Sequence, residues 1–510
     1  ALRAPSVGPP VFASVDTRSV ADFGQAPHWG LGGWFGPPGL FGELRHESRS
    51  ICILLCGQDG LLIPVNRDSI GRSDASRRCS LPVEWPMPDY LPRVVDAELD
   101  ELLRALPALT LEGPKAVGKT ETARRRARTI HRLDQPGPRA LAEADPDILL
   151  SGEPPILIDE WQYVPSVYDA VRRAVDSDPS PNRYLLAGSA VPNQAPTHSG
   201  AGRIVRVRMR PLSLSERGIA PPSVSLGALL TGAQSPVAGH TTVTLADYAR
   251  EIIGSGFPGV RPLSGRALRT QLDGYLARIV DRDFIDQGHA VRRPETLRRW
   301  MTAYAAATAT TTTYEKIRDA ATGGEGHTPT RPTVLAYRDV LERLWILDPV
   351  PAWLPTRSQL ARLTQAPKHH LADPALAARL LGVDEAALLS GTPAAHATPR
   401  DGTLMGQLFE SLVTLSVRVY AQAAEAAIRH LRTRDGRQEI DLIVERPNQR
   451  VLALEVKLSA TVTDDDVRHL LWLREQLGHE VLDMVVVTTG THAYRRRDGV
   501  AVIPAALLGP

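Results

Sequence analysis

The chain has 510 residues, of which 43% are hydrophobic and 23% are charged, and its formal net charge at pH 7 is +2. This length exceeds one ordinary hydrophobic core and predicts two or three domains. The near-neutral charge gives no argument for nucleic-acid binding, and the longest apolar runs fall far short of the roughly 18 residues of a membrane span. No secretory signal pattern opens the sequence, so we expect a cytoplasmic protein without a membrane segment.

Residues 1–86 differ from the rest of the chain. They are rich in Gly, Pro and Ser, hold all three cysteines, and show no sustained period apart from a strand expected at 51–55. Patterned sequence begins near Met87. The first 86 residues are therefore predicted to be a disordered extension or to precede the true start, with a small accessory domain as the alternative.

Short apolar strands alternate with helices between residues 106 and 210. Strands are expected at 108–111, 156–158, 184–187 and 204–209, and helices near 120–129 and 167–176. This alternation is typical of a mainly parallel sheet covered on both faces. The predicted fold class of residues 87–220 is therefore α/β, with a mainly parallel sheet.

The stretch GPKAVGKT has the spacing GxxxxGK[ST] between an apolar strand and a helix. Such a loop wraps backbone amides around phosphates, while its lysine adds positive charge and its hydroxyl ligates magnesium. The predicted nucleotide-binding residues are Gly113, Pro114, Lys115, Ala116, Val117, Gly118, Lys119 and Thr120. ATP and Mg²⁺ are the expected ligands, and an ordinary glycine turn is the alternative.

Two carboxylates, Asp159 and Glu160, follow directly after the apolar strand in PPILIDEWQ. Open α/β sheets bind ligands at the carboxyl ends of their strands, so both side chains are expected beside the phosphates. Asp159 is predicted to hold magnesium through water, and Glu160 to orient or deprotonate the attacking water.

The motifs GPKAVGKT, ILIDEWQ, RYLLAGSA and GRIVRVRMRPLSLSE resemble the AAA-type P-loop ATPases. More narrowly, they resemble a large family of bacterial and archaeal ATP-binding proteins with a C-terminal domain of unknown function, and the similarity continues through GFPGV, YLARIVDRD and LADPALAARLLG. The resemblance implies that Ser189 senses the γ-phosphate, with a plain turn as the alternative, and makes Arg203 a candidate arginine finger. Arg203 has a second interpretation, because Arg206, Arg208 and Arg210 alternate with apolar residues as on the solvent face of an edge strand.

Residues 221–365 are predicted to be mostly helical, and a winged-helix module is one hypothesis for residues 296–353. The helix expected at 333–347 has apolar spacing at Val334, Tyr337 and Val340. Helix-turn-helix modules read DNA, but this spacing more often marks a helix that faces a core.

The last hundred residues switch to helix, three strands, helix and strand. The segments RQEIDLIVE and VLALEVKLS carry Asp441, Glu455 and Lys457, and strand alternation places Glu455 and Lys457 on one face. Two such carboxylates would bind a metal ion, with the lysine positioning a hydroxide. The pattern resembles the PD-(D/E)xK nuclease fold, which implies an α/β domain at 366–510 with Glu410 as its helical acid. Asp441 follows isoleucine rather than proline, a departure from that motif, and many nuclease-like folds only bind.

These observations predict a Mg²⁺-dependent ATPase whose nucleotide state is relayed to the C-terminal domain. The alternatives are an ATP-gated, metal-dependent DNA or RNA nuclease and a slow nucleotide switch that binds a protein partner. Besides ATP, the candidate partners are DNA, another protein, and further copies of the chain in a homo-oligomer.

Overall fold

The computed structural model describes residues 90–189, 201–232, 235–289, 291–322, 328–353, 366–390, 404–433 and 436–510, and the backbone of four strands at 14–16, 41–46, 49–56 and 61–65. The chain divides into two compact units, Ala1–Pro88 and Asp89–Pro510.

The first unit contains one sheet in the strand order β1-β2-β3-β4. Its strands are β1 (Ser14–Asp16), β2 (Phe41–His46), β3 (Arg49–Cys56) and β4 (Leu61–Val65). Strand β3 includes the strand expected at 51–55. The predictions of disorder or of an upstream start concern mainly residues outside the described ones and stay predictions.

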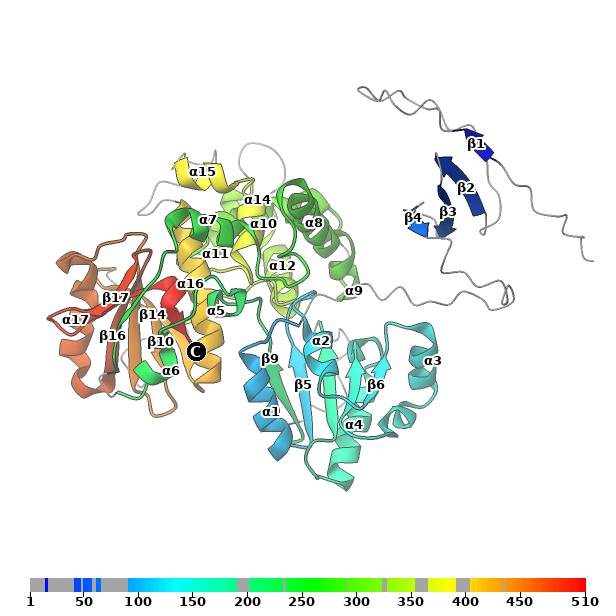
Figure 1. Ribbon diagram of the computed structural model, residues 1–510. Coiled ribbons are helices and arrows are strands. Elements are labelled where there is room, and N and C mark those ends of the chain that lie inside the picture. The colour runs from blue at the N-terminus through cyan, green and yellow to red at the C-terminus, as the bar shows by residue number, and fades with distance from the viewer. Residues whose placement is uncertain are drawn as a thin grey trace, which may run out of the picture. The chain divides into compact units, whose positions relative to one another are not determined.

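The second unit begins with a five-stranded parallel sheet in the order β6-β7-β8-β5-β9 (Figure 1). Its strands are β5 (Ala108–Glu112), β6 (Thr129–Arg132), β7 (Ile156–Asp159), β8 (Tyr184–Gly188) and β9 (Ile204–Arg208). Its helices are α1 (Val95–Ala105), α2 (Lys119–Arg124), α3 (Pro136–Ala144), η2 (Pro146–Leu150), η3 (Trp161–Tyr163), α4 (Ser166–Ser177) and α5 (Leu214–Arg217).

All four strands predicted for this sheet are present, but the helix predicted at 120–129 is too long. Helix α2 ends at Arg124, and the chain forms strand β6 from Thr129 onward. The arginine-rich run has a good helix propensity, whereas Thr129 and Ile130 are β-branched and their backbone pairs with β7. Pairing with the neighbouring strand therefore overrides the local preference.

Alternate side chains of the central strands pack in two separate hydrophobic cores. Leu109 and Leu111 pack in the core that contains Leu99 of α1, while Ile158 packs in the core that contains Val171 of α4. Figure 1 shows α1 and α4 covering this sheet. Strands β5, β7 and β8 end at one edge, where their last residues are paired, and this edge carries the polar residues described below.

Helices predominate between the two sheets of the second unit. They are α6 (Leu226–Leu229), α7 (Leu245–Ile253), α8 (Gly265–Arg278), the π-helical turn η4 (Ile279–Asp283), α9 (Phe284–Asp286), α10 (Pro294–Ala306), α11 (Tyr314–Ala320), α12 (Arg331–Arg343), α14 (Pro374–Leu380) and α15 (Glu385–Ser390). The described part of residues 296–353 contains no small sheet of its own that would form a wing; strand β12 (Ala352–Trp353) joins the later sheet.

The later sheet is mixed and has eight strands in the order β11-β17-β18-β16-β15-β14-β13-β12. Its other strands are β11 (Gly239–His240), β13 (Ala427–Arg432), β14 (Glu439–Glu445), β15 (Val451–Val456), β16 (Val481–Thr488), β17 (His492–Arg495) and β18 (Ala501–Pro504). Two short turns, η5 (Gly478–Glu480) and η6 (Ala505–Leu507), and the strand pair β10 (Val224–Ser225) with β19 (Leu508–Gly509) complete this part.

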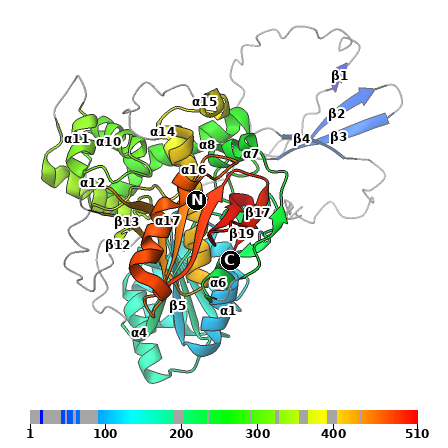
Figure 2. The ribbon, with the colours of Figure 1, turned by 90° about the vertical axis from the view of Figure 1, so that its left-hand side faces the viewer.

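Two helices cover the faces of this mixed sheet. Helix α17 (Asp464–Leu477) places Leu470 in the core that contains Ile443 and Val486 on one face. Helix α16 (Leu404–Ala423) lies on the other face (Figure 2). Its Leu412 belongs to the core on that side. The edge strands β11 and β12 come from earlier parts of the chain, so the sheet is assembled from three separate segments. Among the described helices, none is long and apolar enough to cross a membrane.

Candidate functional site

Residues 113–120 form the turn that joins β5 to α2. Ala116 and Gly118 have left-handed backbone conformations, with φ of 64° and 102°. A Cβ at Gly113 would lie 2.1 Å from the carbonyl oxygen of Met209, so only glycine fits this close approach. Helix α2 starts at Lys119, and the free amides of its first turn are the groups that such a loop offers to phosphates.

The Lys119 ammonium is buried and folds back on this loop. It donates hydrogen bonds to the carbonyl oxygens of Gly113 at 2.9 Å and Pro114 at 2.8 Å. Burial lowers the pKa of Lys119 to about 8, although the carboxylates of Glu160 and Asp159 act in the opposite direction. Both present acceptors are neutral, so a phosphate would bind the ammonium more strongly than they do.

The side chains of Thr120 and Asp159 meet at the carboxyl edge of the sheet. The Thr120 hydroxyl donates to the two Asp159 carboxylate oxygens at 3.1 and 3.0 Å. Burial, and then the neighbouring Glu160, raises the pKa of Asp159 to about 6. A hydroxyl and a carboxylate in contact are the hard oxygen ligands that Mg²⁺ prefers beside a nucleotide.

Glu160 follows β7 in a left-handed conformation, with φ of 56°, and its carboxylate belongs to a small polar network. The Ser189 hydroxyl donates to Glu160 Oε2 at 3.1 Å, and the Gln162 amide donates to the same oxygen. Ser189 follows directly after β8 and is 1% exposed. The ends of two neighbouring strands thus bring together Glu160, the residue predicted to act on water, and Ser189, the predicted sensor of the γ-phosphate.

The structure does not bring Arg203 to this edge. Strand β9 runs parallel to β5, with Ile204 opposite Ala108, so Arg203 lies at the amino end of the sheet. The P-loop lies at the carboxyl end, about 16 Å away for a five-residue strand. Arg203 instead pairs with Asp176 at 2.8 Å and takes no part in its own chain's phosphate site.

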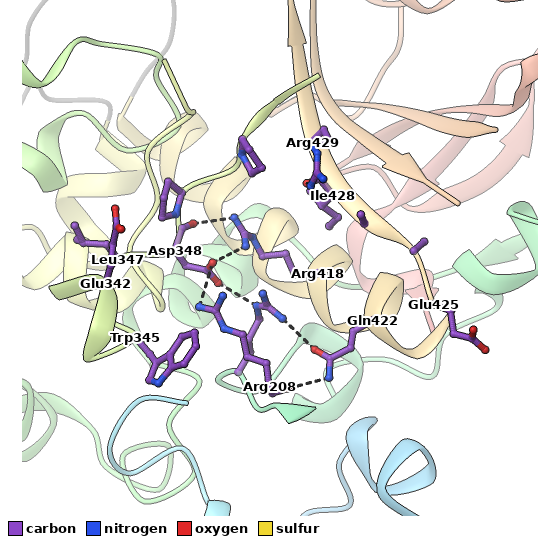
Figure 3. Close-up of a pocket in the computed structure, with 15 residues that line it drawn as sticks. Arg208, Glu342, Trp345, Leu347, Asp348, Arg418, Gln422, Glu425, Ile428 and Arg429 are labelled. Carbon is purple, nitrogen blue, oxygen red and sulfur yellow. Dashed lines mark hydrogen bonds and ion pairs between the residues drawn. The ribbon is translucent and has the colours of Figure 1, made fainter. Parts of the chain in front are cut away.

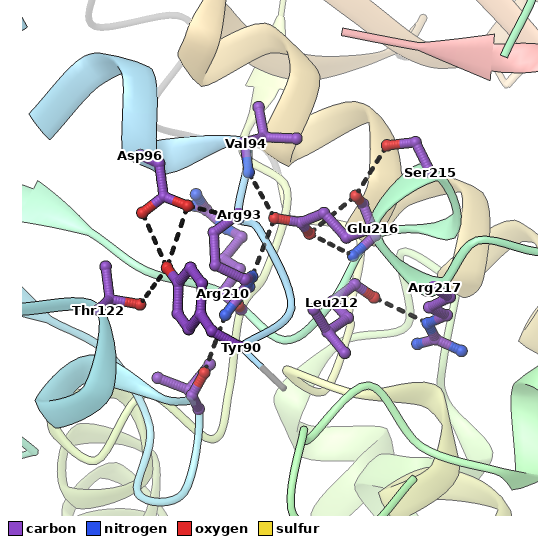
Figure 4. Close-up of polar contacts among 12 residues, drawn as sticks. Tyr90, Arg93, Val94, Asp96, Thr122, Arg210, Leu212, Ser215, Glu216 and Arg217 are labelled. Atoms are coloured by element: carbon purple, nitrogen blue, oxygen red, sulfur yellow. Dashed lines mark hydrogen bonds and ion pairs between the residues drawn. The ribbon is translucent and has the colours of Figure 1, made fainter. Parts of the chain in front are cut away.

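A buried arginine that the sequence analysis missed supports the P-loop. Arg93 donates to the carbonyl oxygen of Val117 at 3.0 Å and to that of Arg210 at 2.6 Å (Figure 4). Its Nε pairs with Glu216 at 3.0 Å, and both side chains are 3% exposed. The two partners are 123 positions apart, so no local spacing could reveal the pair.

Lys115 points out of the loop towards the helical region. Its ammonium pairs with Asp283 of η4 at 2.6 Å, and the Tyr275 hydroxyl of α8 donates to its carbonyl oxygen at 3.2 Å. Asp283 is 4% exposed and lies in a π-helical turn, a feature often found at functional sites. Lys115 therefore links the phosphate loop to the helices rather than lining the loop's interior.

The carboxylates predicted for the C-terminal domain gather around a lysine that was not among the predicted ligands. Lys368 is 1% exposed, and its ammonium pairs with Glu410 and Asp441, each at 2.8 Å. The other Asp441 oxygen accepts from the Val456 amide at 2.9 Å. The ammonium thus lies between the two acids that the nuclease resemblance would assign to a metal ion. In the sequence, the signal that could have pointed to Lys368 is the rarity of lysine, which occurs at only five positions.

The remaining members of this cluster lie on β15 and after it. Glu455 is 4% exposed, and Lys457 approaches it at 3.4 Å. Burial raises the pKa of Glu455 well above its usual range, and burial also raises the pKa of Glu410, to about 8. Burial alone would raise the pKa of Asp441, but the Lys368 and Lys457 ammonium groups, together with the hydrogen bonds that Asp441 accepts, lower it to about 2. Within the described residues, no group of three or more His, Cys, Asp or Glu side chains is arranged to hold a metal ion.

Comparison with known families divides the second unit into three parts. Residues 106–217 match the family model of an AAA domain, which includes the P-loop, Asp159, Glu160 and Ser189. Residues 245–387 match a domain of unknown function (DUF8612), and residues 405–508 match another (DUF4143).

Two mycobacterial proteins are similar along most of the chain. An uncharacterized protein of Mycobacterium tuberculosis and one of Mycobacterium bovis are each 25% identical to it over 487 residues. The match covers 93% of this chain and 90% of each relative. The segment that carries the phosphate loop is therefore similar to AAA-type ATPase domains, and the helical and C-terminal parts are similar to domains whose function is unknown.

Proposed function

We propose that the chain is a Mg²⁺-dependent ATPase that relays its nucleotide state to the C-terminal domain. One observation carries the proposal: the hydroxyl of Thr120 touches the carboxylate of Asp159 beside the buried ammonium of Lys119. These residues come from the amino end of a helix and the carboxyl end of a strand. An ordinary glycine turn has no reason to unite them.

The groups present fit a nucleotide with magnesium. Lys119 is held by two neutral carbonyl oxygens of its own loop, so a phosphate can replace them without leaving a charge unpaired. Thr120 and Asp159 supply hard oxygen ligands, as magnesium requires. When bound there, the ion would neutralise charge on the phosphates.

Glu160 is the residue best placed to act on water. Its carboxylate accepts from Ser189 and Gln162, which fix its orientation at the edge of the sheet. In the proposed reaction, the oxygen of water forms a bond to the γ-phosphorus, the bond to the β-phosphate oxygen breaks, and Glu160 receives or directs the proton of the water. Ser189 would then report a change at Glu160 to β8.

A structural path for the relay starts at the P-loop itself. Lys115 of the loop forms an ion pair with Asp283 of η4, so a movement of the loop would also displace this part of the helical region. On the other side of the loop, Gly113 abuts Met209, which follows the edge strand β9. The side chain of Gln422, on α16, donates to the carbonyl oxygen of Arg208, the last residue of β9. Strand β9 therefore contacts both the loop and the C-terminal domain.

ATP hydrolysis by purified protein tests the proposal. Lys119→Ala removes the only buried ammonium at the described P-loop and is expected to lower turnover by about 100-fold or more, since it removes a group that stabilises transferring phosphate. Lys316→Ala, at an exposed lysine of α11, is the matched control and should hydrolyse ATP as the wild type does. Equal turnover in wild type and Lys119→Ala would overturn the assignment.

Glu160→Gln separates binding from chemistry in the same assay. The variant should bind ATP with near wild-type affinity and turn it over slowly, because the amide accepts no proton from water.

Addition of DNA to these reactions tests the predicted nucleic-acid partner. The position of the Lys368 ammonium between Glu410 and Asp441 gives the nuclease alternative no support.

A further inference from the structure

A cavity of about 700 Å³ lies where three parts of the second unit meet. Its walls come from the end of β9, from the turn after α12, and from the end of α16 with the start of β13. This volume falls within the range of small-ligand sites. The cavity is separate from the phosphate loop, whose residues do not line it.

Three guanidinium groups in this cavity share one buried carboxylate (Figure 3). Asp348 pairs with Arg418 at 2.5 Å, with Arg210 at 3.0 Å and with Arg208 at 3.2 Å. The carboxylate is 8% exposed, and the Arg418 side chain 9%. The cluster therefore carries two positive charges more than its own carboxylate neutralises.

The cluster's hydrogen-bonding capacity is incompletely used. Among the described residues, the Nε atoms of Arg208 and Arg418 are buried and have no hydrogen-bond partner. Burial, together with the mutual repulsion of the arginines, lowers the pKa of Arg208 to about 9 and that of Arg418 to about 10, although Asp348 raises both. Buried positive charge without enough counter-charge is costly to a folded protein unless an anion completes the site.

The other carboxylates of the cavity do not supply that charge. Glu425 is exposed, and Figure 3 shows its side chain pointing away from the arginines. Glu342 has a partner of its own, Arg338, at 3.5 Å. The centre of the cavity is therefore positive. The Arg208 guanidinium lies over the Trp345 ring, 4.5 Å from the ring centroid, so this aromatic side chain lies beside the positive centre.

We propose that this cavity binds a small phosphate-bearing molecule of about mononucleotide size, with the phosphate on Arg208, Arg210 and Arg418 and the remainder along Trp345. Arginine forks bind phosphate oxygens in pairs, which suits three converging guanidinium groups. The cavity size and the aromatic side chain favour a small organic phosphate over a bare ion.

The backbone that carries two of these arginines also touches the phosphate loop. Arg208 and Arg210 flank Met209, whose carbonyl oxygen lies against Gly113. The Met209 amide donates to the carbonyl oxygen of Glu112 at 2.7 Å. The carbonyl oxygen of Arg210 accepts from Arg93, which also holds the loop. An anion that draws Arg208 and Arg210 into the cavity would therefore shift the wall of the ATP site.

Calorimetric titration with inorganic pyrophosphate tests the proposal in the full chain, because two substitutions separate the two anion sites. Arg208→Gln should abolish or weaken binding at the cavity by roughly 10- to 100-fold, the cost of a charge-assisted hydrogen bond. Lys119→Ala should leave that binding in place and affect only the P-loop. Arg206→Gln, at a 63% exposed arginine of the same strand, is the matched control and should bind as the wild type does.

Several outcomes decide against the cavity. Pyrophosphate binding that is lost in Lys119→Ala and unchanged in Arg208→Gln would place the only anion site at the P-loop and overturn the proposal. If Arg208→Gln does not fold, Arg208→Lys decides: it keeps the positive charge but loses the planar fork that binds phosphate oxygens in pairs, so binding should weaken by about 3- to 10-fold, and an unchanged affinity would count against the site.

The same titration identifies the source of the phosphate. AMP or GMP that binds the Lys119→Ala protein and competes with pyrophosphate supports a free nucleotide as the ligand. A short single-stranded DNA that competes while both mononucleotides fail would overturn the small-ligand proposal in favour of a nucleic-acid backbone. Failure of the ATPase proposal would appear separately, as unchanged ATP hydrolysis in Lys119→Ala.

Discussion

Lys368 shows how much one buried side chain decides in the C-terminal domain. Its ammonium reaches Glu410 on α16 and Asp441 on β14, and it approaches Glu439 at 3.8 Å. Without the Lys368 ammonium, these carboxyl groups would lie close together in a buried site with no positive charge between them. A fixed ammonium there neutralises acids in the way that a metal ion would, but it exposes no coordination position to a substrate.

Lys368→Met is therefore expected to destabilise the protein by about 3–5 kcal/mol, the usual cost of breaking a buried ion pair. Adding Glu410→Gln should restore part of that loss, because one unpaired acid is then removed. Thermal unfolding of the single and double variants measures the coupling. Lys457→Met is the control, since Lys457 is 35% exposed and should cost less. A double variant no more stable than Lys368→Met would contradict the assigned pairing.

Residues close in sequence were the ones that could be predicted. The P-loop and the acidic pair follow from short spacings between a strand and a helix, and the structure unites Thr120 with Asp159. Arg208 and Arg210 were assigned to solvent by the strand pattern, yet they converge on Asp348, which lies 138 positions after Arg210. Such a partner can be found only once the chain is folded.

At the scale of elements, the short helix α5 matters because its capping box is also a support for the P-loop. Glu216 accepts from the Ser213 amide at 2.7 Å and from Arg93 Nε at 3.0 Å, and Arg93 in turn donates to Val117. The same carboxylate thus closes the helix and holds the arginine.

Glu216→Ala is expected to destabilise the protein by about 3 kcal/mol or more and to weaken ATP binding, because both the cap and the ion pair of Arg93 are lost. Asp247→Ala at the capping box of α7 is the matched control. It removes an exposed cap, should cost about 1 kcal/mol, and should leave ATP affinity unchanged. Equal effects of the two substitutions on ATP affinity, measured by titration with a non-hydrolysable analogue, would refute the link.

Secondary-structure elements could likewise be predicted only where a local sequence pattern defines them. The order helix, three strands, helix, strand at the C-terminus is confirmed by α16, β13 to β15, α17 and β16, but the prediction missed the strands β17, β18 and β19 that follow. The two-residue strands β11 and β12 carry no periodic pattern, so no sequence window reveals them. Their pairing partners, β17 and β13, define them instead.

For the whole molecule, the match of residues 405–508 to one domain family does not make that segment self-sufficient. Strands β11 and β12 complete the edges of its sheet from outside the segment. Helix α16 also contributes Ser416 and Tyr420 to hydrogen bonds with the backbone of α5. The sheet edges and the outer face of α16 would be bare in isolation.

Residues 404–510 expressed alone are therefore expected to aggregate or to remain partly folded, whereas residues 89–510 should give a folded protein. Size-exclusion chromatography and circular dichroism of both fragments make the comparison. A monomeric, cooperatively unfolding fragment of residues 404–510 would show that the borrowed strands are dispensable.

The borrowing of strands across the chain also bears on how quickly the protein reaches its native state. His240 of β11 pairs with His492 of β17, and Gln422 donates to Glu98, 324 positions earlier. Contacts of this separation require long loops to close before any stabilisation is gained, which slows folding. The chain should therefore pass through long-lived intermediates with uncovered strand edges, and its yield on refolding should fall as protein concentration rises.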